Sequence, residues 1–148
     1  EDPSRFEPHY ERITHPEQVQ IYEAILADSH GAVTTGLIAA VRYLKDNRLL
    51  PAGFDKRTAD PDISVKGTAV DDPDFMAGGD RVLYDISLGS AEGPYRLIAE
   101  LWYQPIAFRW ARNLSEYDAP ETRRFAGFYD SMAASSAVVL ARDAVTVR

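Results

Sequence analysis

Apolar and polar residues alternate with a period of two through the first two thirds of the chain, and this pattern predicts β-strands. The clearest case is a pair of alternating segments, 81–88 and 95–103, separated by the turn-forming residues 89–94. Residues 81–103 therefore read as an antiparallel hairpin that ends at Pro105, because proline cannot donate to a strand ladder. Three further strands are expected over 19–26, 35–44 and 63–70, of which the second also fits a short helix.

The pattern changes to helical spacing after Pro105, where Ile106, Trp110 and Leu114 fall on one face of a short helix. A second helix is expected to begin at Asp118, with Glu121 three residues later, and the β-branched segment 138–147 predicts a closing strand. We therefore expect a mainly β fold, an antiparallel β-sandwich or jelly-roll-like sheet with one or two short helices in the C-terminal third.

Length and composition narrow the class of protein. The 148 residues predict a single domain, 1–148, with a folded core, and the start at Glu1 without methionine suggests a fragment of a longer protein or a processed protein. A net charge of -7 argues against a nucleic-acid partner, and no apolar run approaches the ~20 residues that span a bilayer. The absence of cysteine excludes disulfides and thiolate-ligated metals.

Carboxylates gather in the segment 60–80, beside glycines, and carboxylate oxygens are ligands that calcium prefers. The candidate metal ligands are Asp71, Asp72, Asp74 and Asp80. Their spacing differs from that of an EF-hand loop, so turn-forming aspartates in polar loops are the simpler interpretation. The histidines, His9, His15 and His30, fall in no recognisable metal or triad pattern.

Aromatic residues cluster over residues 95–110, and Trp102 and Trp110 are candidates for stacking on a sugar ring, although core packing explains most of the cluster. Glu100 lies among apolar neighbours, and Arg48 is the candidate partner for a structural ion pair with it; Arg42 and Arg109 are alternatives. A glycosidase that uses Glu23 and Glu100 would need the two carboxyl groups about 5–10 Å apart in a cleft.

Four segments carry a family resemblance: Gln20–Glu23, Arg42–Phe54, Ala99–Ile106 and Arg109–Leu114. Together they resemble the C-terminal, non-haem region of bacterial multihaem c-type cytochrome-like proteins. The resemblance implies an accessory domain, periplasmic or extracellular, whose partner is an upstream haem domain of the same protein or another redox protein. Covalent attachment of haem needs a Cys-x-x-Cys-His motif, which this sequence does not contain. We therefore expect no cofactor in this segment, and the resemblance implies that haem c is bound in an upstream part of the parent protein.

Two hypotheses of function follow. The first is a non-catalytic extracytoplasmic accessory or interaction domain associated with an electron-transfer protein. The alternative is a carbohydrate or cell-surface ligand-binding module, assisted by calcium at the aspartate loops. The charged segment 42–56 is interpreted as a corner of the fold, in which Lys45, Asp46 and Asn47 form a turn and Leu49 and Leu50 anchor the loop.

Overall fold

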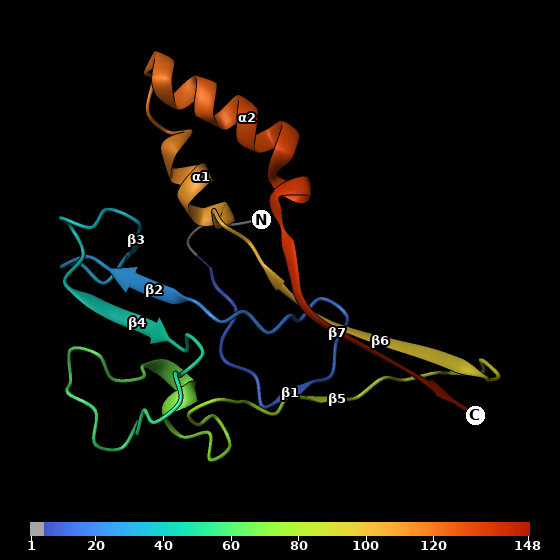
Figure 1. Ribbon diagram of the computed structural model, residues 1–148. Helices are drawn as coiled ribbons and strands as arrows, with labels where there is room; N and C mark the ends of the chain where they lie inside the picture. Colours follow the sequence, from blue (N-terminus) through green and yellow to red (C-terminus); the bar gives the residue numbers. More distant parts are fainter. Residues whose placement is uncertain (1–4) are drawn as a thin grey trace. The chain divides into compact units, whose positions relative to one another are not determined.

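The computed structural model describes residues 5–148, and the chain divides into two compact units, Glu1–Ser87 and Leu88–Arg148 (Figure 1). We call them the N-terminal and the C-terminal unit. Among the described residues, the N-terminal unit contains most of the buried side chains, and the C-terminal unit contains most of the regular secondary structure.

The N-terminal unit contains two small sheets. The strands β3 (Val33–Thr34), β2 (Ala24–Ala27) and β4 (Arg42–Asp46) form an antiparallel sheet with β2 in the centre, and β1 (Arg12–Ile13) pairs in parallel with β5 (Leu83–Tyr84) (Figure 1). One 3₁₀ turn, η1 (Gly67–Val70), follows β4 along the chain. These strands are short, so long loops make up most of the unit.

An apolar cluster of Val65, Ala69 and Phe75 forms the centre of the N-terminal unit, with Tyr22 and Leu50 packed against it. The rings of Tyr22 and Phe75 are stacked, with their centroids 6.5 Å apart. The ammonium group of Lys56 lies 5.7 Å from the centre of the Phe75 ring and donates to the carbonyl oxygens of Ala69 and Asp72. Lys56 therefore connects the loop after η1 to the apolar cluster through these contacts.

A β-bulge shapes β4. Ile25 pairs with Lys45 and Leu26 with Tyr43, so Leu44 is the extra residue on β4. The sequence pattern assigned Lys45, Asp46 and Asn47 to a turn, but Lys45 and Asp46 belong to β4, all three residues are buried, and Asn47 is fully so. That interpretation was wrong because these polar side chains find partners inside the unit, which pattern alone does not reveal.

The C-terminal unit consists of a two-stranded antiparallel ribbon and a helical hairpin. Strand β6 (Tyr95–Tyr103) leads into α1 (Phe108–Leu114) and α2 (Pro120–Ser136), and the chain returns along β6 as β7 (Val138–Val147) (Figure 1). The first residue of α2 is Pro120, and the hydroxyl of Thr122 accepts from the backbone N–H of Ala119. Asp118 does not cap the helix but pairs with Arg123.

Cross-strand pairing gives the ribbon two different faces. The pairs Tyr95–Val147, Leu97–Val145, Ala99–Asp143, Leu101–Ala141 and Tyr103–Val138 lie on one face, which we call the apolar ribbon face. The other face has Arg96–Thr146, Ile98–Ala144, Glu100–Arg142 and Trp102–Val139. Leu140 is the extra residue of a bulge in β7, since Ala141 pairs with Leu101 and Val139 with Trp102.

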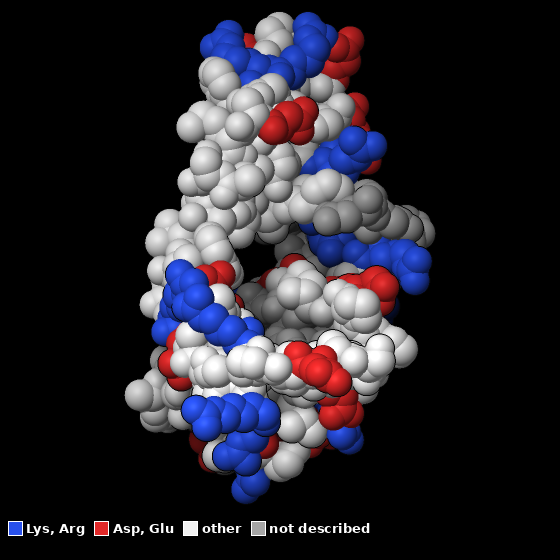
Figure 2. Space-filling model, turned by 90° about the vertical axis from the view of Figure 1, so that its right-hand side faces the viewer, with Lys and Arg blue, Asp and Glu red and all other residues white. Residues whose placement is uncertain are grey.

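Most large apolar side chains of the C-terminal unit are exposed. Ala111 is its one buried apolar residue in the part of the chain described, and every residue of β7 is exposed. On α2, Phe128 and Met132 are 61% and 59% exposed. Figure 2 shows charged side chains gathered at the far end of the helical hairpin and a largely uncharged surface below them. This unit therefore leaves uncovered the surface that a folded domain normally buries.

The expectation of a sandwich or jelly roll was wrong. Strand makes up 26% of the structure and helix 19%, and the strands form three small sheets of two or three strands each. Residues 95–103 and 138–147 do form strands with the predicted bounds, but they pair with each other. The predicted hairpin 81–103 does not form, because Leu83–Tyr84 pairs with Arg12–Ile13 instead. Residues 63–70, predicted as a strand, include the 3₁₀ turn η1.

Charge is divided unevenly between the units. Residues 1–87 contain 16 of the 23 acidic and 9 of the 16 basic residues, and residues 88–148 contain seven of each. The whole net charge of -7 therefore belongs to the N-terminal unit, and the C-terminal unit has none.

Within residues 5–148, no helix has both the length and the apolar composition that crossing a membrane requires.

Candidate functional site

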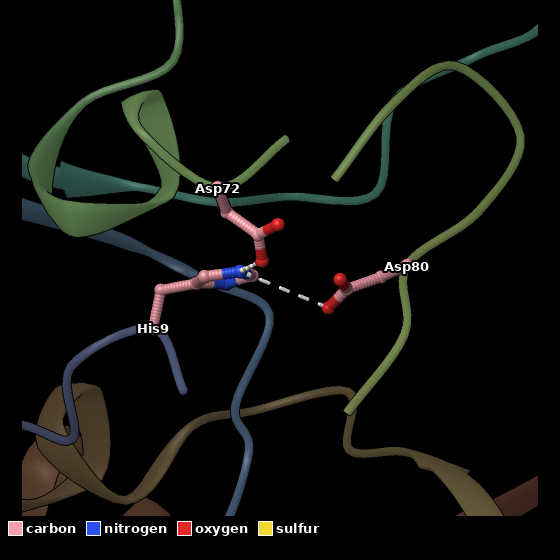
Figure 3. Close-up of side chains that lie close together, drawn as sticks. All are labelled: His9, Asp72 and Asp80. Carbon is pink, nitrogen blue, oxygen red and sulfur yellow. Dashed lines mark hydrogen bonds and ion pairs between the residues drawn. The ribbon is translucent and has the colours of Figure 1, made fainter. Parts of the chain in front are cut away.

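Three segments of the N-terminal unit place titratable side chains against each other (Figure 3). His9 comes from the coil before β1, Asp72 from the loop after η1, and Asp80 from the segment before β5. The Nε2 atom of His9 lies 2.9 Å from Oδ2 of Asp72 and 3.8 Å from Oδ2 of Asp80. All three side chains are at most 2% exposed, so this polar group lies inside the unit.

The other ring nitrogen of His9, Nδ1, faces two side-chain amides. Nδ2 of Asn47 lies 3.0 Å from it and Nε2 of Gln20 lies 2.9 Å from it. The orientation of Asn47 is fixed, since its Oδ1 accepts from the N–H of Glu23 and its Nδ2 also donates to the carbonyl of Ile21. Nδ1 must therefore accept, and the ring proton is on Nε2, where it points at Asp72.

The four carboxylate oxygens of the cluster all have donors. Oδ1 of Asp72 accepts from the N–H groups of Asp74 and Phe75, and its Oδ2 accepts from His9. Oδ2 of Asp80 accepts from the hydroxyl of Tyr22 at 2.7 Å and from Gln20 at 3.3 Å, and its Oδ1 accepts from the N–H of Arg81. Buried carboxylates with every oxygen paired form a stable network.

Two pKa values reflect this environment. Burial by itself would raise the pKa of Asp72, but hydrogen bonds from His9 and from the N–H groups of Asp74 and Phe75 outweigh burial and lower it. Burial, followed by the hydrogen bond to Asp80, strongly raises the pKa of Tyr22, which therefore stays protonated as a donor. The network is thus built to hold Asp72 as a carboxylate and Tyr22 as a phenol.

His9, Asp72 and Asp80 are a geometric candidate for a metal centre, because one ligand atom from each lies within 4.8 Å of the others. A histidine that binds metal through Nε2 must have its proton on Nδ1, and it usually donates that proton to an acceptor. Here Nδ1 meets the amide donors of Asn47 and Gln20 instead. The residues therefore fit a proton on Nε2 better than a metal ion, and they form a structural network, which we call the His9 network.

The His9 network predicts how stability depends on pH. The pKa of Asp72 lies below its ordinary value of 3.8, so its stabilising effect is fully present above that pH and is lost as the pH falls through the lower, folded-state pKa. We expect the free energy of unfolding of the N-terminal unit, measured with urea between about pH 2 and 6, to fall less steeply in Asp72→Asn than in the wild type. The control is Asp71→Asn, whose side chain is exposed. Equal slopes in all three proteins would contradict the assignment.

The other predicted site residues lie in separate places. Asp71 is exposed, and Asp74 lies 4.0 Å from Arg81, so the structure gathers only Asp72 and Asp80 of the four candidate metal ligands. Arg48 pairs with Asp46 at 2.7 Å, and Glu100 pairs with Arg142 across the ribbon at 3.2 Å. Each of the two residues proposed as an ion pair therefore has a partner within its own unit.

The two candidate stacking residues are on different elements of the C-terminal unit. Trp102 lies on β6, is 52% exposed and donates from its indole N–H to Glu100 at 3.0 Å. Trp110 lies on α1 and is 41% exposed. No ring contact recorded among the described residues joins them into one stacking platform.

The importance of His9, Asn47 and Lys45 was missed at the level of sequence. His9 and Asp72 are 63 residues apart, and a hydrogen bond of that separation leaves no local pattern. The one sequence signal was indirect: Asn47 follows an apolar strand in which Lys45 takes an inward-facing position of the alternation.

Comparison with known proteins gave no match. No family model, no curated protein and no solved structure is similar to this chain at a significant level. A proposal of function therefore rests on the geometry of the two units and on the resemblance noted in the sequence.

Proposed function

We propose that this chain is a non-catalytic interaction domain that docks on a protein partner through the apolar ribbon face. The observation that carries this proposal is the uncovered state of that face. Leu97, Val145 and Val147 are 40%, 56% and 44% exposed, and Tyr103 and Val138 at its other end are 53% and 52% exposed. Together these side chains present roughly 400 Å² of surface, which is within the range of the largest apolar patch on a typical soluble protein, and such a patch is often functional.

The composition of the C-terminal unit supports a protein partner. Both tryptophans and seven arginines lie there, with no lysine. Protein interfaces are enriched in aromatic residues and arginine and depleted in lysine. The lack of net charge argues against an anionic or strongly cationic polymer as the ligand.

One charged residue specifies the chemistry of the partner. Asp143, opposite Ala99, is the only charge on the apolar ribbon face. Its carboxylate accepts the N–H of Ala144 and makes no ion pair among the described residues. A partner that covers this face therefore has to present an apolar surface with a basic side chain opposite Asp143, since an unpaired buried carboxylate is strongly unfavourable.

The resemblance to the non-haem region of multihaem c-type cytochrome-like proteins makes a haem-bearing electron-transfer protein outside the cytoplasm the proposed partner. The His9 network supports a non-catalytic role, because both ring nitrogens of His9 are occupied and its side chain is 1% exposed. A general base has to reach its substrate, and His9 does not.

Capture of the partner tests this proposal. The chain is immobilised, exposed to the extracytoplasmic fraction of cells that produce it, and the retained protein is measured by the Soret absorbance of haem c. We expect haem protein on the wild type and at least about tenfold less on Val145→Glu, because a charge buried in the contact weakens binding by more than 1.4 kcal/mol.

Thr146→Glu is the matched control, since it adds the same charge to the next residue of β7 but on the opposite face. It should retain as much haem protein as the wild type. If the wild type retains no haem protein, or if the two variants behave alike, the proposal fails.

A further inference from the structure

The outer edge of β7 is the second unpaired surface of the C-terminal unit. Strand β7 pairs with β6 on one side, and no described strand pairs with its other side. All ten of its residues are exposed. The backbone N–H and C=O groups along that edge therefore have no strand partner among the described residues, although the N–H of Ala144 donates to the carboxylate of Asp143 and would have to exchange this acceptor on pairing.

This edge has few of the devices that prevent pairing. Exposed edges are usually protected by proline, lysine or bulges. Strand β7 has no proline, glycine or lysine, and its protective features are the bulge at Leu140 and the two charged residues Arg142 and Asp143. The segment beyond the bulge, Ala141–Val147, is a regular strand of seven residues. Strand β6, by contrast, lies between Pro94 and Pro105.

The segment Ala141–Val147 can pair with a second copy of itself without bringing like charges together. In an antiparallel pair about a twofold axis at Ala144, Arg142 is opposite Thr146 of the second copy and Asp143 is opposite Val145, so no like charges meet. Ala141 is then opposite Val147, and the two small Ala144 side chains meet at the axis. In this register, the side chains of each pair point to the same face of the sheet, so every residue stays on the face that it has in the ribbon.

We propose that two copies of this chain pair antiparallel along the outer edges of β7, over Ala141–Val147 with Ala144 on the twofold axis. The product is a four-stranded sheet in the order β6–β7–β7–β6. A two-stranded ribbon is marginal in water and three or more strands are stable, so pairing stabilises the unit. The C-terminal unit has no net charge, so the pairing sheets do not repel each other.

This inference goes beyond the proposed function, because it concerns the edge of the ribbon and leaves the apolar ribbon face free. The symmetric pair sets two apolar ribbon faces side by side in one sheet. A dimer therefore offers a docking surface twice as wide as that of one chain.

The mass of the chain in solution tests the dimer. Light scattering after gel filtration should give twice the chain mass of 16.5 kDa. The protein concentration is varied from about 1 to 100 μM, so that a dissociation constant in the micromolar range is detected. Ala144→Arg places two like charges at the axis and should shift the dissociation constant upward at least about tenfold. Ile98→Arg adds the same charge to the same ribbon face, on β6, and should remain dimeric.

A covalent test uses the natural absence of cysteine. Under oxidising conditions, Ala144→Cys should form a disulfide-linked dimer, because side chains directly opposite each other in antiparallel strands have Cβ atoms about as close as a disulfide requires. Ile98→Cys, one strand away from the axis, should stay largely monomeric. A wild-type chain of single mass up to 100 μM, or equal cross-linking of the two cysteine variants, would overturn the dimer. Ala144 lies on the face opposite Val145, so failure here leaves the docking proposal untouched.

Discussion

Replacing His9 by leucine is expected to lower the free energy of unfolding of the N-terminal unit by about 3–5 kcal/mol. The substitution removes the N–H that pairs with Asp72 and the acceptor that Asn47 and Gln20 share. It leaves a buried carboxylate oxygen of Asp72 without that donor and the amides of Asn47 and Gln20 without their shared acceptor, and several unpaired buried polar groups together have an effect of this size. Few single substitutions in the chain should match it.

The measurement has to report on the N-terminal unit. Both tryptophans lie in the C-terminal unit, so tryptophan fluorescence is unsuitable, and hydrogen exchange of residues 20–47 in increasing urea is the better probe. His30→Leu is the control, because the His30 side chain is 88% exposed, and its effect should stay within about 0.5 kcal/mol. A His9→Leu effect as small as that of His30→Leu would show that the His9 network does not stabilise the fold.

Lys45→Met is expected to have the second largest effect, a loss of about 3 kcal/mol from the same unit. Lys45 is 2% exposed, and its ammonium group donates to the carbonyls of Glu7 and Ile21, both at 2.8 Å. It also lies 3.4 Å from a carboxylate oxygen of Glu23. Methionine fills a similar volume, so the effect measures the lost donors and the charge that Glu23 keeps, not a cavity.

Lys66→Met serves as the matched control for Lys45→Met. Lys66 is half-buried, and its ammonium group bonds to the hydroxyl of Ser64, so its removal should change stability by less than about 1 kcal/mol. Urea unfolding followed by hydrogen exchange of β2 and β4 compares the two variants. Equal losses would mean that burial of Lys45 contributes nothing specific.

Local structure could be predicted where the sequence itself determines it. Alternation predicted residues 95–103 as a strand, β-branched residues predicted a strand over 138–147, and the apolar spacing after Pro105 predicted the helical region. Pairing could not be predicted in the same way. Strand β6 pairs with a segment more than 30 residues away instead of with its neighbour, because a turn-like sequence between two strands permits a hairpin without requiring one.

The candidate site was harder to predict for a related reason. Asp72 and Asp80 were singled out as carboxylates in a loop, but their partner, His9, comes from the start of the chain. Lys45 and Asn47 were assigned to a turn because the segment Lys45, Asp46 and Asn47 supplies side chains that often form turns. Their burial depends on acceptors and donors supplied by residues 7–23, which meet β4 only in the folded unit.

The uneven placement of lysine has a practical consequence. Lys45, Lys56 and Lys66 are the only lysines, and all three belong to the N-terminal unit. Amine-reactive esters therefore cannot modify a side chain of the ribbon or of the helical hairpin, and a chain biotinylated in this way keeps its apolar ribbon face chemically intact. For the same reason, lysine-directed cross-linkers find no anchor on that face, so a partner bound there is better detected with a carboxyl-directed reagent, which can react with Asp143.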